Sequence, residues 1–194
     1  MLSISKDYSA QSVEDRILDA AASCVLAYGV DRVTLAEIAR RAGVSRPTVY
    51  RRFPDTRSIL AALLTMRITH ALDDVPSRGV GREQVVERVV AVAGRLRLDD
   101  VIMMVLHEAP DLAMLYLSER LGTSQQILLD TVAGELKAAQ DEGSVRAGDV
   151  RQFAAMCLLI TQSTILSAQL VEPILDGHAL ATELSHSLNG YLKP

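Results

Sequence analysis

The sequence predicts an all-α protein with a small N-terminal domain over residues 10–56 and a larger helical domain over residues 57–194. Apolar side chains recur every three or four residues through most of the chain, which is the period of an amphipathic helix. Capping residues, glycines and prolines divide this pattern into segments of helical length. One of these segments, residues 34–53, contains two short helices joined by a glycine turn.

The composition is that of a globular, reducing-compartment protein. Of the 194 residues, 49% are hydrophobic and 23% are charged, so the chain can bury a core and is not disordered. Its two cysteines, Cys24 and Cys157, lie far apart in apolar helical patterns. They predict reduced core thiols in a cytoplasmic protein, and no zinc-binding spacing occurs. The N-terminus lacks the apolar segment of a signal peptide.

The first helix is predicted to begin after Ser12 and to end at Gly29. Ser12 can cap the helix, and Asp15 occupies the capping-box position. Its apolar stripe provides a floor for two further helices and comprises Ile17, Leu18, Ala21, Val25 and Leu26.

The segment TLAEIARRAGVSRPTVYRRF predicts a helix-turn-helix. Thr34 can cap the first helix, and Glu37 completes a capping box. Gly43 supplies the positive-φ residue that ends this helix. Ser45 can cap the second helix, and Pro47 suits its first turn, where a missing N–H costs little.

The second helix divides into a buried and an outward face. At about 100° per residue, Val49 and Phe53 share one side with Ser45, whereas the arginines lie elsewhere. Arginine donates two hydrogen bonds from a planar fork, which suits phosphates and guanine edges. An arginine face kept only for solubility is the alternative, but the caps, the turn and the outward Thr, Tyr and Arg residues together favour DNA binding.

The distribution of charge along the chain also favours DNA binding. Residues 31–60 hold seven arginines against Asp31, Glu37 and Asp55, a local charge of +4 in a chain of net charge −4. A basic module on an acidic body is expected where one part meets phosphate.

Residues 17–60 resemble the TetR family of transcriptional regulators in the ILDAA opening, IARRAGVS and the TVYRRF recognition helix. The resemblance implies a helical ligand-binding and dimerisation domain after this module. It also implies the following DNA-contacting residues: Thr34, Ser45, Arg46, Pro47, Thr48, Tyr50, Arg51 and Arg52. Many members have Gly in place of Pro47 and Lys in place of Thr56, so Arg57 is the candidate replacement for that lysine's phosphate contact.

Helices are predicted for the remaining chain at 56–72, 82–97, 99–108, 110–122, 123–141, 149–171 and 178–192, with a turn-rich break at 73–81. In the family the helix over 56–72 links the DNA-binding module to the body. Phe153 to Val171 contains no charge over 19 residues, near the length of a membrane span. Its polar interruptions and the missing basic flank instead favour a helix buried on nearly all sides, with no membrane.

The helices 123–141 and 149–171 carry more apolar surface than a small monomer needs. The resemblance makes them dimer helices of a four-helix bundle, and a core internal to the monomer is the alternative. The candidate interface residues are Ile127, Leu128, Val132, Leu136, Phe153 and Ile160. A homodimer also explains how a helix-turn-helix finds one site, because two copies read a palindromic operator.

A pocket for an unidentified small-molecule effector is predicted from adaptable methionines and nearby polar groups. The candidates are Met103, Met104, His107, Met114, Tyr116, Met156 and Gln162. Core packing explains the same methionines. Aromatic residues amount to 4% with no Trp, which favours an aliphatic or acyl effector over a flat aromatic one.

Catalytic and metal-binding patterns are weak. His107 and Glu108 are adjacent and point apart on a helix, and the Glu183–His186 spacing lacks the second motif of a di-iron site. We therefore expect no enzyme activity, cofactor or metal, and a ligand-responsive repressor that an apolar effector releases from DNA. The alternative is a helical ligand-binding or enzymatic protein whose N-terminal module contacts protein rather than DNA.

Overall fold

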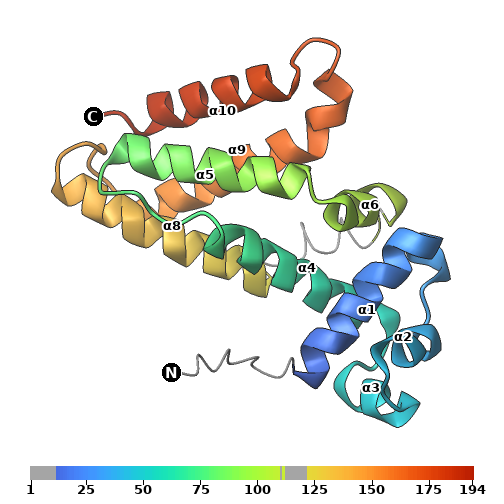
Figure 1. Ribbon diagram of the computed structural model, residues 1–194. Coiled ribbons are helices and arrows are strands. Elements are labelled where there is room, and N and C mark those ends of the chain that lie inside the picture. Colours follow the sequence, from blue (N-terminus) through green and yellow to red (C-terminus); the bar gives the residue numbers. More distant parts are fainter. Residues whose placement is uncertain (1–11, 110, 112–121) are drawn as a thin grey trace, which may run out of the picture. The chain divides into compact units, whose positions relative to one another are not determined.

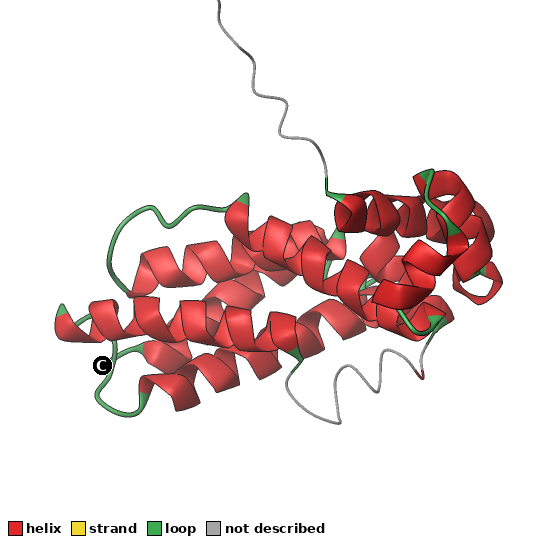
Figure 2. Ribbon diagram, turned by 90° about the horizontal axis from the view of Figure 1, so that it is seen from below, coloured by secondary structure: helices red, strands yellow, loops and turns green. Residues whose placement is uncertain are grey.

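The structure is a computed structural model that describes residues 12–109, 111 and 122–194, and every regular element among them is a helix (Figures 1 and 2). The all-α prediction is therefore confirmed. The chain divides into two compact units, residues 1–63 and 64–194. This division falls inside the fourth α-helix, α4 (Thr56–Asp73), rather than at its start, because Ile59, Leu60 and Leu63 are buried.

The first unit contains three α-helices and a short 3₁₀ turn before α4. These elements are α1 (Val13–Tyr28), η1 (Val30–Arg32), α2 (Leu35–Ala42) and α3 (Arg46–Arg52). α2 packs on both α1 and α3. Their shared core is made of aliphatic side chains, which include Ile17, Leu18, Ala21, Val25, Leu35, Ile38, Ala39 and Val49.

The helix boundaries follow the caps in the sequence. Ser12 and Asp15 form the predicted capping box, and Gly43 ends α2 in the left-handed conformation at φ 65°. Thr34 Oγ1 accepts the Glu37 N–H at 3.2 Å. The reciprocal bond from Glu37 is not made, because its carboxylate binds Arg40 and Arg41 instead.

The second unit is built from long helices that run alongside one another (Figure 1). After the end of α4 come α5 (Arg82–Arg97), α6 (Asp100–Glu108), α8 (Thr123–Asp141), α9 (Val150–Val171) and α10 (Gly177–Leu192). α5 packs against α8, α9 and α10, and α8 packs along α9. The helix predicted over 110–122 lies mostly outside the described residues.

α9 is long and apolar enough to cross a membrane, judged by length and composition alone. The prediction that it is buried on nearly all sides is wrong, because only 17% of its 18-residue apolar window is buried within the protomer. Phe153, Ala154, Cys157 and Ala168 face inward. The opposite side exposes large apolar residues, among them Leu159 and Leu170 at 59% and 82%.

Candidate nucleic-acid interface and internal cavity

The recognition helix α3 presents a polar, cationic face. Val49 and Phe53 are buried in the first unit, whereas Arg46, Pro47, Arg51 and Arg52 are exposed, and Tyr50 is 54% exposed. The helix start is fixed by Ser45, whose Oγ accepts the Thr48 N–H at 3.3 Å and lies 2.8 Å from the Thr48 hydroxyl. The predicted residues therefore lie together on a short, rigid element: Ser45, Arg46, Pro47, Thr48, Tyr50, Arg51 and Arg52.

The guanidinium groups on this face are uncommitted. Arg46, Arg51 and Arg52 form no ion pair or hydrogen bond with any residue that the structure describes. Each can therefore bind an external acceptor without breaking an internal contact.

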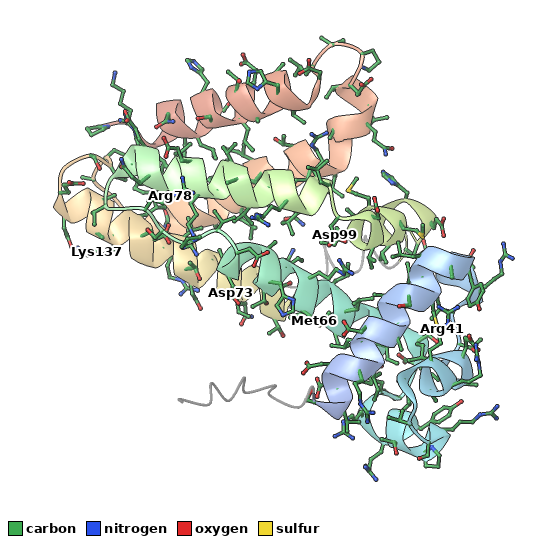
Figure 3. The ribbon with its side chains drawn as sticks, viewed as in Figure 1. Arg41, Met66, Asp73, Arg78, Asp99 and Lys137 are labelled. Carbon is green, nitrogen blue, oxygen red and sulfur yellow. The ribbon has the colours of Figure 1, made fainter. Side chains whose placement is uncertain are left out.

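The arginines of α2 are committed to contacts within the unit. Glu37 Oε1 accepts from Arg40 Nη2 at 2.6 Å and from Arg41 Nε at 3.1 Å. Hydrogen bonds from Arg40 first, and then from Arg41, lower the pKa of Glu37 to about 2. Arg41, labelled in Figure 3, also donates to the Tyr28 hydroxyl at 2.7 Å and to the Ser23 carbonyl at 3.1 Å, which ties α2 to α1.

The start of α4 places one further cation at the surface. Asp55 Oδ1 accepts the Ser58 N–H at 2.7 Å and so caps this helix. Arg57 is exposed in the first turn, whereas Thr56 is half-buried. Of these two residues, Arg57 is the one that can offer a cation to phosphate.

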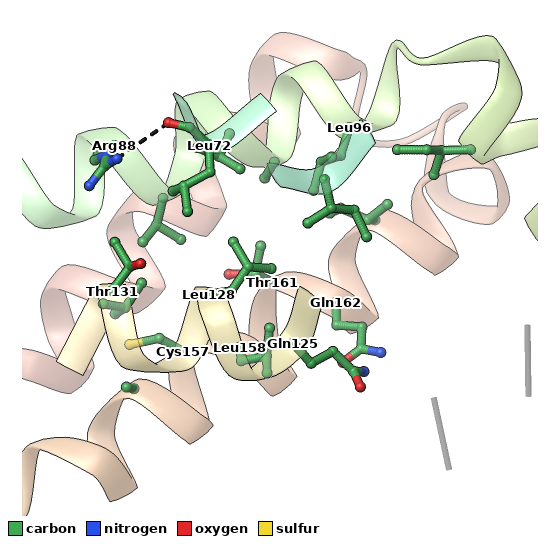
Figure 4. Close-up of a pocket in the computed structure, with 18 of the residues that line it drawn as sticks. Leu72, Arg88, Leu96, Gln125, Leu128, Thr131, Cys157, Leu158, Thr161 and Gln162 are labelled. Carbon is green, nitrogen blue, oxygen red and sulfur yellow. Dashed lines mark hydrogen bonds between the residues drawn. The ribbon is translucent and has the colours of Figure 1, made fainter. Parts of the chain in front are cut away.

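The second unit contains a partly open cavity of about 130 Å³ (Figure 4), and the surface of its wall is almost entirely apolar. It is bounded by α4, α5, α6, α8 and α9. Its lining residues are Leu64, Ile68, Leu72, Arg88, Val89, Val92, Ala93, Leu96, Ile102, Leu106, Gln125, Leu128, Thr131, Val132, Glu135, Ala154, Cys157, Leu158, Thr161, Gln162, Ile165 and Leu166.

The charged side chains of the lining are paired with each other and with the backbone. Arg88 Nη1 donates to the Glu135 carboxylate. Its Nε donates to the Val75 carbonyl at 2.6 Å, and its Nη2 donates to the Leu72 carbonyl at 3.3 Å, drawn as a dashed line in Figure 4. Arg88 thereby caps the C-terminal end of α4, where carbonyl groups lack helical partners and a cation is favourable.

The uncharged polar residues of the lining also turn their atoms from the cavity. Gln125 is 5% exposed, and its Oε1 accepts the Gly122 N–H at 2.8 Å. Thr161 Oγ1 is buried and lacks a partner among the described residues. Burial raises the pKa of the Cys157 thiol to about 11, so this thiol is neutral and unreactive at physiological pH.

Residues 17–63 match the model of the bacterial regulatory proteins of the tetR family. An uncharacterized HTH-type transcriptional regulator of Mycobacterium tuberculosis is 62% identical over 192 residues, covering 99% of this chain and 100% of the relative. The chain belongs to the TetR family. It is thus a helix-turn-helix transcriptional regulator, as the sequence predicted.

Solved structures of more distant TetR-family members share the fold. The repressor QsdR of R. erythropolis has a TM-score of 0.67 at 19% identity and covers 94% of this chain and 96% of its own. FadR of Thermus thermophilus, a repressor solved in complex with lauroyl-CoA, has a TM-score of 0.67 at 18% identity, with 92% and 94% coverage.

The cavity of this TetR-family chain includes one of the predicted pocket residues. Gln162 lines the cavity, but Met103, Met104, His107 and Met156 do not. Met156 is 40% exposed on the outer side of α9. Met114 and Tyr116 lie outside the described residues. The wall of this cavity is built mainly of Leu, Ile, Val and Ala.

Sequence reasoning missed Arg88 and Glu135. A signal for Arg88 was present, because it falls on the apolar stripe of α5 formed by Val85, Val89 and Val92. A charged residue on a core-facing stripe is rare unless it is paired.

The predicted interface residues are divided by the structure. Ile127 is exposed and Ile160 half-buried, whereas Leu136 and Phe153 lie in the core of the protomer, and Leu128 and Val132 line the cavity. The last four are therefore used inside one chain. Helical periodicity shows which residues share a face, but it does not show which neighbour covers that face.

Proposed function

We propose that this TetR-family regulator is a cytoplasmic, homodimeric repressor that binds a palindromic operator and is released by a small apolar effector. The observation that carries the proposal is the set of uncommitted arginines on α3 and at the start of α4. A repressor needs cations that are free to meet phosphates and base edges.

The DNA contact is assigned to the exposed side of α3. Arg51 and Arg52 lie in the last turn of α3, and Arg46 lies in its first turn. Guanidinium groups therefore extend from both ends of this helix, and the major groove of DNA admits an α-helix. Tyr50 and Thr48 add hydrogen-bonding groups between them. Arg57 and Thr34 are assigned to the phosphates that flank the groove, because both are exposed at helix starts.

The dimer contact is assigned to the outer face of α9. Met156, Leu159 and Leu170 are all exposed and are spaced by three and eleven residues, and none of them lines the cavity. This is the spacing of a helix-packing seam. An exposed row of apolar side chains is unfavourable in water. A second copy of the chain, related by a twofold axis, would cover the row on α9, so no membrane is needed to cover it. Two recognition helices would then read half-sites about 34 Å apart.

The effector site is assigned to the cavity of the second unit. Apolar, largely preformed cavities are typical small-molecule sites.

A salt series on operator binding tests the proposal directly. The purified protein should retard a fragment of its own upstream DNA, and the logarithm of its affinity should fall linearly with the logarithm of salt concentration. A flat dependence, or no retarded fragment at low salt, contradicts DNA binding and favours the alternative in which the module contacts an acidic protein.

Sedimentation of interface variants tests the dimer. Leu159→Asp places a charge in the proposed interface and should shift the protein from dimer to monomer at micromolar concentration. Leu98→Asp is the matched control, because Leu98 is 74% exposed but lies between α5 and α6. A Leu159→Asp protein that remains dimeric contradicts the assignment of α9.

A further inference from the structure

We infer that the cavity of the second unit selects an uncharged aliphatic group and rejects the corresponding carboxylate, and that Glu135 is the residue that sets this choice. The inference rests on the proposed effector site and specifies the chemistry of its ligand.

The shape and composition of the wall favour an aliphatic guest. Aliphatic side chains such as Leu64, Val92, Leu128 and Ile165 form it, and no aromatic ring is among its described lining residues. An apolar cavity of roughly 150 Å³ holds a benzene-sized guest. This cavity of about 130 Å³ therefore takes an alkyl segment of about six carbon atoms.

Arg88 would ordinarily attract a carboxylate, because a guanidinium binds carboxylates through paired hydrogen bonds. Here its three nitrogen atoms already donate to Glu135, Val75 and Leu72. Both members of the ion pair are largely withdrawn from solvent. The two charges therefore neutralise each other, and three of the five guanidinium N–H groups are already used.

A guest carboxylate at Arg88 would either displace Glu135 or share the guanidinium with it. In both cases Glu135 would be a largely buried anion beside a second anion, which is strongly unfavourable. An uncharged guest displaces nothing, because Arg88 and Glu135 satisfy each other. Glu135 thus occupies the place that a fatty carboxylate would otherwise take.

The substitution Glu135→Gln reverses this logic. Glutamine keeps the size of Glu135 and can still accept from Arg88 through its carbonyl oxygen, but it removes the negative charge. Arg88 then has a net charge available for a carboxylate guest. Its bonds to the Val75 and Leu72 carbonyls are unaffected.

The experiment is calorimetric titration of three probes that share one alkyl chain: 1-octanol, octanoate and octanoyl-CoA. The wild-type protein should bind 1-octanol at least about 10-fold more tightly than octanoate. Glu135→Gln should strengthen octanoate binding by about 10- to 100-fold and leave 1-octanol unchanged. Glu87→Gln on α5 is the matched control, because Glu87 is exposed and does not line the cavity.

1-Octanol and octanoyl-CoA are both uncharged next to the alkyl chain. Comparing their affinities therefore shows whether the cavity prefers a free neutral molecule or a chain carried on a thioester. The inference is overturned if octanoate binds the wild type as tightly as 1-octanol, if neither binds, or if Glu135→Gln leaves their ratio unchanged while the variant melts as a folded protein. Operator binding without any probe is measured in parallel. A failure of ligand selectivity is thereby separated from a failure of DNA binding, and tight 1-octanol binding that leaves operator affinity unchanged contradicts only the effector role.

Discussion

Arginine has opposite roles in the two units. On α3, Arg46, Arg51 and Arg52 are exposed and make no contact with the described part of the chain. In the cavity wall, Arg88 is half-buried and donates to one carboxylate and two backbone carbonyls. The side chain is the same, but the arginines of α3 have no internal partner among the described residues, whereas all three nitrogen atoms of Arg88 donate to internal acceptors.

The difference shows how charge marks function in this protein. An exposed cation stays hydrated in the free protein, so it has no desolvation cost there, and it gains an anionic partner when DNA binds. A cation inside the body must be paired at all times, so it contributes to stability and selectivity. Net charge alone could not separate these roles, because burial and pairing decide them.

Breaking the buried pair should give the largest effect on stability. Glu135→Ala leaves Arg88 charged without its anion and should lower the free energy of unfolding by about 3 kcal/mol. Urea denaturation followed by circular dichroism measures the change. The exposed neighbour Glu87 supplies the control, because Glu87→Ala should change stability by less than about 0.5 kcal/mol. Equal effects from both substitutions would show that the Arg88–Glu135 pair has no structural role.

Removing a free arginine should weaken DNA binding and leave stability unchanged. Arg51→Ala should reduce operator affinity by about 10- to 100-fold, because the proposed bidentate contact of Arg51 with a base would be lost. Arg57→Ala should act through phosphate and reduce the salt slope by about 1. Operator affinity measured by fluorescence anisotropy at several salt concentrations distinguishes the effects of the two substitutions.

Arg40→Ala is the comparison variant, since Arg40 is exposed but paired with Glu37. If Arg40→Ala weakens operator binding as much as Arg51→Ala, internal pairing does not separate binding from structural arginines.

Helices were predictable because local chemistry determines them. Thr34, Gly43 and Ser45 act as caps and turn residues in the structure as they do in the sequence pattern. The buried and exposed sides of α3 were also predictable, because one helix of seven residues has only one apolar stripe. These properties depend on neighbours within about four residues.

The cavity and the helix partners were not predictable in the same way. Leu136 and Met156 both lie on apolar stripes of long helices, yet Leu136 is fully buried within the protomer and Met156 is exposed. The distinction depends on where α5 and α10 pack, which the periodicity of α8 or α9 does not contain. The pairing of Arg88 with Glu135 joins residues 47 positions apart, so it too needed the fold.

Removing an unpaired hydroxyl from the cavity wall should stabilise the protein, whereas breaking the Arg88–Glu135 pair should destabilise it. Thr161 Oγ1 is buried without a described partner, so Thr161→Val removes an unsatisfied polar atom and should raise the free energy of unfolding by about 1 kcal/mol. Thr164→Val on the same helix is the control, because the Thr164 hydroxyl donates to the Ile160 carbonyl at 2.8 Å. A loss of stability in Thr161→Val would indicate that its hydroxyl has a partner.

Acid titration should show the smallest effect and should separate the committed arginines of the first unit from its free ones. The pKa of Glu37 lies at about 2, below its ordinary value of 4.5, because Arg40 and Arg41 bind the charged form. A depressed carboxyl pKa contributes stability that is fully present above pH 4.5 and is lost as the pH falls toward 2.

The carboxyl carbon resonance of Glu37 should therefore move below pH 4 in the folded protein, and Glu37→Gln should remove that part of the acid dependence. Arg41 ties α2 to α1, Arg40 is paired with Glu37 within α2, and neither belongs to the α3 face. Glu37→Gln should consequently leave the salt slope of operator binding unchanged. A steeper slope in this variant would mean that Glu37 withholds Arg40 or Arg41 from DNA, and the free set of arginines would then extend beyond α3 and Arg57.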